Sequence, residues 1–168
     1  MPSTSKHLRR AHDHLTVAHK LSGDPETLSW AAVVLFYAAR DLVHAVFDAD
    51  PDLSEVCKHP TSHSNQELAN PGTNTVLKRH YRSVATAYLD LYSISLGVRY
   101  EGRRVDVEMW HELMHDWDDV CRWASRHFVD WQRSAPDWLT GVGARKTATP
   151  PPSEEDGGVS LWPDGGRS

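Results

Sequence analysis

The sequence predicts an all-α fold, a four- to five-helix bundle followed by a disordered C-terminal tail. Apolar residues recur at helical spacing in four long segments, and no segment shows the alternation of a half-buried strand. Gly, Pro or Asp residues stand where these segments start and end. We therefore expect residues 1–140 to form the bundle. Residues 141–168 are rich in Gly, Pro and Ser and cannot bury enough apolar surface to offset the entropy lost on ordering, so we expect a disordered tail.

The first predicted helix covers residues 5–21 and ends before Gly23. Its apolar residues share one face at helical spacing: Leu8, Ala11, Leu15 and Ala18. This pattern is typical of a helix that packs one side against a core and leaves the other in water.

The second predicted helix covers residues 24–48 and begins with Asp, Pro and Glu, a favourable order for a helix start. The sixteen positions from 31 to 46 are apolar apart from Arg40, Asp41 and His44. A helix that is apolar nearly all round is buried in a core. The three polar side chains must then be paired or line a cleft, because unpaired buried charge is costly. We expect the chemistry of the protein near them.

A polar connection of residues 50–74 follows, for which we predict a helical turn near residues 65–69. A third helix is expected over residues 75–96, ending at Gly97, and a fourth from Asp106 onwards. The apolar residues of the fourth helix stand at helical spacing: Trp110, Leu113, Trp117, Cys121, Ala124 and Phe128.

Length, charge and cysteine content narrow the function classes. A chain of 168 residues is long enough for one domain with its own core, and a net charge of -5 argues against broad electrostatic attraction to nucleic acid. We expect no signal peptide in residues 1–10 and no membrane span, since three polar residues interrupt the longest apolar run. Two cysteines are too few for a disulfide framework, which predicts a cytoplasmic location.

The stretch from His111 to His115 reads H-E-x-x-H. In zinc proteases the two histidines of this motif bind the metal and the Glu activates its water. At about 100° per residue, however, Glu112 points away from the apolar stripe of its helix, and no strand is predicted to pack beside it. We interpret the motif as a solvated helix face.

A second metal hypothesis combines His44 with His111 and His115 in a three-histidine site between bundle helices. This spacing resembles that of metal-binding four-helix proteins of the DNA-damage-inducible family. The alternative remains open at the level of sequence.

Arg40, Asp41 and His44 suit a different chemistry. An Arg that stabilises a phosphate and a His that moves a proton are what metal-independent RNA cleavage requires. The structural alternative is a buried ion-pair network, which perturbs the same residue types without catalysis.

Five short segments occur in an order that resembles small bacterial HEPN-type domains: Trp30-Ala-Ala, Phe36-Tyr37-Ala38-Ala39, His59-Pro-Thr-Ser-His63, Tyr88-Leu-Asp-Leu-Tyr-Ser93 and Arg99-Tyr100-Glu101. The resemblance covers about residues 8–129. It implies a four- or five-helix bundle, commonly dimeric. It also implies either a metal-independent ribonuclease of toxin–antitoxin or antiviral systems, or a non-catalytic companion of a nucleotidyltransferase.

The catalytic signature of that family is R-x(4–6)-H with a polar residue after the Arg. Arg40 has a polar follower in Asp41, but the distance to His44 is one residue too short. Two pairs have the shortest permitted spacing: Arg9 with His14 and Arg122 with His127. In both pairs the residue after the Arg is not the expected Asn, Asp or His. The resemblance therefore implies the fold more firmly than the activity.

The loop from His59 to His63 carries two histidines and two hydroxyls around a proline. It can bind an anion or present a proton donor, and His63 is the candidate for that role. The alternative is a turn in which Ser62 or Ser64 caps the next helix.

Cationic residues are concentrated around the third helix and the loop after it: Lys78, Arg79, Arg82, Arg99, Arg103 and Arg104. We expect the arginines to form one basic patch that contacts an RNA backbone. The alternative is that these charges only solvate a loop.

Together these features predict an RNA-acting HEPN-like domain of bacterial stress response or defence, either a ribonuclease or a degenerate RNA binder. In this hypothesis Arg40 beside Asp41, or a loop arginine, holds the phosphate, and His44 or His63 transfers the proton. We expect a homodimer that needs no cofactor, with RNA, an antitoxin or a nucleotidyltransferase as candidate partners. Two alternatives remain, a non-catalytic interaction module and the three-histidine metal protein.

Overall fold

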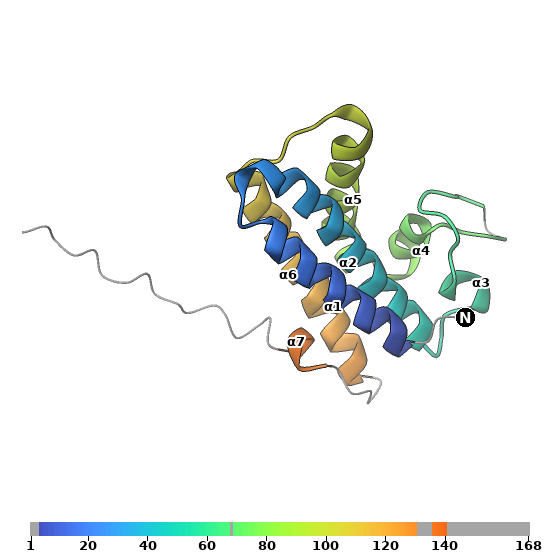
Figure 1. Ribbon diagram of the computed structural model, residues 1–168. Coiled ribbons are helices and arrows are strands. Elements are labelled where there is room, and N and C mark those ends of the chain that lie inside the picture. The colour runs from blue at the N-terminus through green and yellow to red at the C-terminus, as the bar shows by residue number, and fades with distance from the viewer. Residues whose placement is uncertain (1–3, 68, 131–135, 141–168) are drawn as a thin grey trace, which may run out of the picture.

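The computed structural model describes residues 4–67, 69–130 and 136–140, and within these ranges every regular element is helical. Four long helices form the bundle: α1 (Thr4–Leu21), α2 (Leu28–Ala49), α5 (Arg82–Glu101) and α6 (Val107–Asp130) (Figure 1). Four short elements complete it: the 3-10 helix η1 (Pro25–Thr27), α3 (Glu55–Lys58), α4 (Thr73–His80) and α7 (Asp137–Thr140). The predicted all-α class is confirmed. The predicted tail, residues 141–168, lies outside the described ranges.

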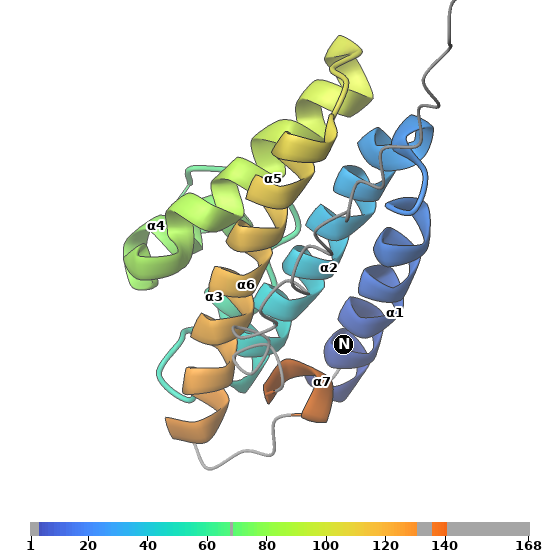
Figure 2. The same ribbon diagram turned by 90° about the vertical axis from the view of Figure 1, so that its left-hand side faces the viewer.

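Helix α2 is the centre of the bundle, with α1 packed along one side and α5 and α6 on the other (Figure 2). Of its 22 residues 15 are buried, including Phe36 and Phe47. Burying a side chain of this size contributes about 1.5–3 kcal/mol. Helix α1 runs antiparallel to α2, and the Thr4 hydroxyl at its start donates a hydrogen bond to Asp48 near the end of α2.

The segment Pro25–Ala49 is long and apolar enough to cross a membrane by length and composition alone. In this structure most of that segment is buried by the other helices. The core helix of a soluble protein meets the same criterion, because a helix surrounded by other helices is apolar all round.

The third predicted helix is in fact two helices, because the chain breaks at Tyr81. The backbone of Tyr81 leaves the helical region (φ -135, ψ 53), and α5 then starts in a new direction. The Tyr81 ring packs against Phe47 and Trp123, and its hydroxyl donates to the carboxylate of Asp50. These contacts come from α2 and α6, so the apolar spacing within residues 75–96 could not indicate the break.

The end of the same helix was also predicted wrongly. Helix α5 continues through Gly97 to Glu101 and ends at Gly102, which adopts a left-handed conformation (φ 68). A Cβ at Gly97 would lie 3.1 Å from the Arg103 side chain, so glycine there permits a close approach rather than a helix end.

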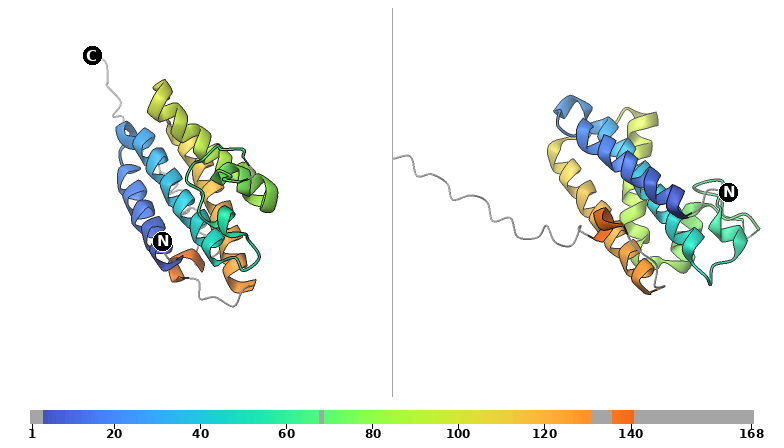
Figure 3. Two further views of the ribbon diagram at one scale, coloured as in Figure 1. Left: turned by 90° about the vertical axis from the view of Figure 1, so that its right-hand side faces the viewer. Right: turned by 60° about the horizontal axis from the view of Figure 1, so that its bottom comes forward.

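The predicted turn near residues 65–69 is absent from the part of that segment that the structure describes, and the connection forms a turn at α3 instead. Residues 62–65 fold back onto α4, as Figure 3 shows, where Thr73 N donates to Ser62 O and Asn74 N to His63 O. Gly72 makes this possible, because a Cβ there would lie 2.7 Å from the carbonyl of His63. These bonds cap the start of α4 with backbone carbonyls.

Candidate functional site

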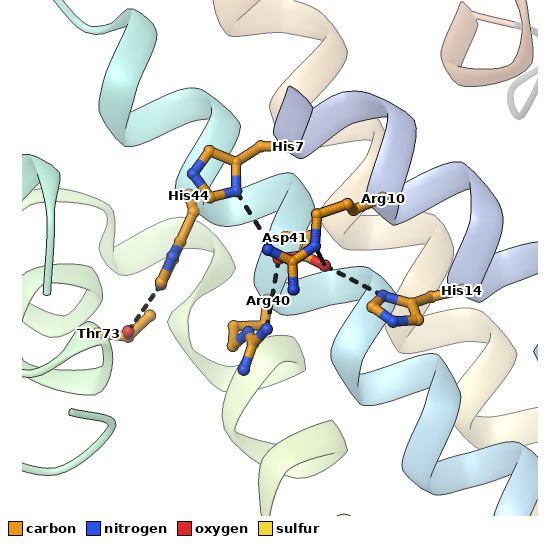
Figure 4. Close-up of polar contacts among 7 residues, drawn as sticks. All are labelled: His7, Arg10, His14, Arg40, Asp41, His44 and Thr73. Carbon is orange, nitrogen blue, oxygen red and sulfur yellow. Dashed lines mark hydrogen bonds and ion pairs between the residues drawn. The ribbon is translucent and has the colours of Figure 1, made fainter. Parts of the chain in front are cut away.

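The carboxylate of Asp41 lies in the core with four basic side chains around it (Figure 4). Asp41 is 1% exposed. Its oxygens lie 3.0 Å from His14 Nδ1, 3.4 Å from Arg40 Nη2, 3.6 Å from Arg10 Nε and 3.7 Å from His7 Nδ1. Arg40 is its neighbour on α2, whereas the other three come from α1. The cluster therefore joins the two helices.

The environment of Asp41 keeps its carboxylate charged. Burial alone would raise the pKa, but His7, whose Nδ1 lies 3.7 Å away, and the charges of Arg40, Arg10 and His14 outweigh it, and the pKa of Asp41 lies below its ordinary value. The sequence predicted that Asp41, inside α2, needs a charged or polar partner, and residues of α1 provide it. Breaking such a buried pair by removing one partner is costly, because the others stay uncompensated.

His44 faces away from this carboxylate, towards the start of α4. Its Nε2 lies 3.0 Å from Thr73 Oγ1, and its ring stacks on Phe47. Burial, followed by the charges of His7 and Arg40, lowers the pKa of His44 to about 3. The imidazole of His44 is therefore neutral and a weak base. Its contact with Thr73 joins α2 to the start of α4.

Tyr37 lies one turn before Arg40 on α2, and two guanidinium groups contact its ring. The Arg40 Cζ lies 4.8 Å from the centre of the Tyr37 ring, and the Arg99 Cζ lies 5.7 Å from it. Arg99 Nη1 also donates to the Tyr37 hydroxyl at 3.2 Å. The His14 ring lies 6.0 Å from the same tyrosine. We define the Tyr37 surface as Arg10, His14, Tyr37, Arg40 and Arg99.

His63 lies beside this surface although it belongs to the connection before α4. Its ring contacts Phe36 and Tyr92, and its buried Nδ1 makes no hydrogen bond. Burial and then the charges of Arg40 and Arg99 lower the pKa of His63. His63 therefore lies within the influence of Arg40 and Arg99, which come from two other segments of the chain.

The five arginines proposed to form one basic patch are divided between the two ends of α5. Arg79 and Arg82 stand at its start, whereas Arg99, Arg103 and Arg104 stand at or beyond its end. A helix of 20 residues is about 30 Å long. A single patch was a wrong prediction, because one continuous helix separates its members.

Arg103 also has acidic surroundings. It lines a cleft between α5 and α6 together with Asp90, Glu112 and Asp116. Burial, then the charges of Asp90, Asp119 and Glu112, raises the pKa of Asp116 to about 6. A cation that shares a cleft with three acidic residues is poorly suited to bind a phosphate.

The histidine hypotheses for metal are not supported by the geometry. His111, Glu112 and His115 are all exposed on α6. Within the described parts of the chain, no group of three or more His, Cys, Asp or Glu side chains is placed to hold a metal ion. The structure thus does not assemble His44, His111 and His115 into one site, because His44 turns towards Thr73.

Sequence analysis missed the contribution of α1. His7, Arg10 and His14 supply three of the four basic groups at Asp41. One signal was present: His7 and His14 are seven residues apart, on either side of Ala11, so both follow the apolar stripe of the helix. A buried histidine in such a phase indicates a polar partner on the neighbouring helix.

No protein family, curated protein or solved structure matches this chain.

Proposed function

We propose that the chain is an RNA-acting, HEPN-like domain that cleaves single-stranded RNA without a metal ion. The observation that supports this best is the position of Arg40 and Arg99 against the Tyr37 ring, with Arg10 beside the carboxylate that Arg40 also contacts. Arg10 and Arg40 share one carboxylate, and Arg99 forms no ion pair with any described residue. The surface therefore carries net positive charge on an otherwise acidic protein, which suits a phosphodiester.

His14 is the residue best placed to move a proton. Its Nδ1 lies 3.0 Å from an oxygen of Asp41, and in the tautomer with the hydrogen on Nδ1 the Nε2 atom is left as a base. The side chain is 32% exposed, so a substrate can reach it. Asp41 places a negative charge beside His14, and this pair takes over the role predicted for His44.

The proposed step is attack of a ribose 2′-oxygen on the adjacent phosphorus. His14 Nε2 takes the proton of the 2′-hydroxyl, the 2′-O–P bond forms, and the P–O5′ bond breaks. The leaving 5′-oxygen takes a proton from solvent, so the products are a 2′,3′-cyclic phosphate and a 5′-hydroxyl. The guanidinium groups of Arg10 and Arg40 stabilise the charge that develops on the phosphoryl oxygens.

Aromatic residues near this surface favour single strands. Trp30 lies seven residues before Tyr37, hence on the same face of α2, and is 59% exposed. Tyr100 is 75% exposed, and the Arg99 guanidinium lies 5.2 Å from its ring centre. Unpaired bases stack on such side chains, while a duplex hides its base faces.

The test is cleavage of a fluorogenic single-stranded RNA in excess EDTA. We expect wild type to release 2′,3′-cyclic phosphate ends. His14→Gln should be slower by about 10²–10⁴-fold, the usual contribution of a positioned base. His115→Gln removes an exposed imidazole on α6 and is the matched control. Binding of RNA without cleavage would leave only an RNA-binding role, and neither binding nor cleavage would refute the proposal.

A second candidate is a non-catalytic interaction module that binds an antitoxin or a nucleotidyltransferase. It is favoured by the burial of Asp41, whose contacts hold α1 against α2 whether or not a substrate binds. In that case wild type has no cleavage activity, and His14→Gln lowers only the melting temperature.

We propose further that the chain is a cytoplasmic homodimer. Other exposed apolar residues lie on α3 and α6: Val56, Val107 and Val129. Exposed apolar groups of this kind mark association surfaces. Cys57 and Cys121 form no disulfide, as is usual in a reducing compartment. Sedimentation of wild type against Val107→Glu tests the dimer.

A further inference from the structure

A second cleft lies where the connection after α3 folds over α4, away from the groups used above. It has a volume of about 390 Å³, within the range of small-molecule sites. Six polar residues line it: Ser64, Gln66, Asn74, Thr75, Lys78 and Arg79. The hydrogen bonds from Gly72 N and Thr75 Oγ1 to Asn65 O hold the two walls together.

One end of the cleft is cationic. Lys78 and Arg79 stand one turn after Asn74 and Thr75 respectively, so the cations and the smaller polar groups share one face of α4. Both cations are exposed, and neither forms an ion pair with a residue that the structure describes. Two unpaired cations side by side are suited to a phosphate group.

Asn74, one turn before Lys78, brings an unsatisfied acceptor to the same cleft. Asn74 is only 7% exposed, and its Oδ1 is buried with no hydrogen-bond partner. Buried polar atoms are nearly always paired, so an orphaned acceptor at a cleft indicates a donor supplied by a ligand. A hydroxyl group is such a donor.

The start of α4 cannot take the phosphate, because its N–H groups are already used. Thr73 N and Asn74 N donate to the carbonyls of Ser62 and His63. The phosphate therefore belongs at Lys78 and Arg79, and the hydroxyl-bearing part of the ligand at Asn74. The separate positions of the cations and of the free acceptor thus determine the orientation of a ligand in the cleft.

We propose that this cleft binds a sugar phosphate, with the phosphate on Lys78 and Arg79 and a sugar hydroxyl donating to Asn74 Oδ1. The hydroxyls and amides of the lining match the hydroxyls of a sugar. No aromatic or acidic side chain lines the cleft among the described residues, so it offers no surface on which a base would stack. The ligand is a free sugar phosphate or the ribose phosphate of an RNA strand, whose 2′-hydroxyl DNA lacks. The site does not depend on the cleavage proposed above.

The experiment is calorimetric titration of the full chain with ribose 5-phosphate, and with ribose and inorganic phosphate as separate probes. We expect ribose 5-phosphate to bind more tightly than either part. Lys78→Ala with Arg79→Ala should weaken binding by about tenfold or more, the effect of losing two charge-assisted hydrogen bonds. Lys20→Ala with Arg126→Ala removes the same charge from α1 and α6 and should leave affinity unchanged.

Asn74→Leu separates a binding role from a structural one. It removes the orphaned acceptor at similar volume, so the melting temperature should hold or rise, while affinity falls for ribose 5-phosphate but not for inorganic phosphate. Competition by a short RNA, and not by the same DNA, would identify the RNA backbone as the source. Competition by neither would identify a free sugar phosphate. Absence of ribose 5-phosphate binding, or equal binding by the Lys78–Arg79 double variant, would overturn the proposal.

Discussion

His14 and Asp41 link α1 to α2 through a contact of 3.0 Å between the imidazole Nδ1 and a carboxylate oxygen that is closed to solvent. The two residues are far apart in the sequence, and each gains from the other. The charge of His14 offsets part of the cost of burying Asp41, and the Asp41 carboxylate lies at ion-pair distance from the imidazole. The same contact therefore serves stability and, in the proposed function, catalysis.

Asp41→Asn should lower the free energy of unfolding by about 3–5 kcal/mol, because the basic groups around it lose their shared counter-charge in a buried place. Urea denaturation at neutral pH measures this loss. Asp13→Asn, which removes an exposed carboxylate from α1, is the control and should change stability by less than about 0.5 kcal/mol. Equal stabilities for the two variants would show that the cluster contributes nothing to folding.

His44 should make the fold weaker in mild acid. Its pKa falls from 6.5 in the unfolded chain to about 3 in the fold, so between these values the unfolded state binds a proton that the folded state does not. The contribution of neutral His44 to the free energy of unfolding is complete above about pH 6.5. It is lost as pH falls towards 3, by about 1.4 kcal/mol per pH unit.

His44→Gln removes this titration and should flatten stability between pH 6 and 4, measured by urea denaturation at several pH values. His63 and His127 also have lowered pKa values and leave a residual slope in the variant. His115→Gln should keep the slope of wild type. An unchanged slope in His44→Gln would contradict the assigned environment.

Asp116→Asn should stabilise the protein at alkaline pH. Burial, with Asp90, Asp119 and Glu112 nearby, raises the pKa of Asp116 to about 6, so the fold disfavours its charged form. The raised pKa favours folding below the unfolded value near 4, and this advantage is lost as pH rises through about 6. The melting temperature of the variant should therefore exceed that of wild type most at pH 8, and the gap should close towards pH 4.

Gly102→Ala should destabilise the end of α5 by about 1–2 kcal/mol, the cost of a left-handed conformation for a residue with a Cβ. The added methyl meets nothing within 4 Å, so the cost comes from the backbone alone. Gly23→Ala is the matched control, because it has no positive φ and makes only an ordinary contact of 3.6 Å. Denaturant midpoints for the pair measure the difference.

The periodicity of the sequence was sufficient for the long helices. Residues 5–21 and 24–48 were predicted within a few residues of α1 and of η1 with α2, and the start of α6 was placed at Asp106, whose side chain accepts from Met109 N. These features depend on helical spacing and on end signals next to each helix. Both are local properties of the chain.

The sequence by itself also established that Arg40, Asp41 and His44 could not lie in an apolar helix without partners. It did not identify those partners. Only the tertiary structure decided that Asp41 meets His14 of α1, that His44 turns to Thr73, and that α5 divides the arginines between two ends. The physical reason is that helical spacing is a property of residues close together in the sequence. The partners of a buried polar side chain depend instead on which faces of distant helices meet when the bundle packs.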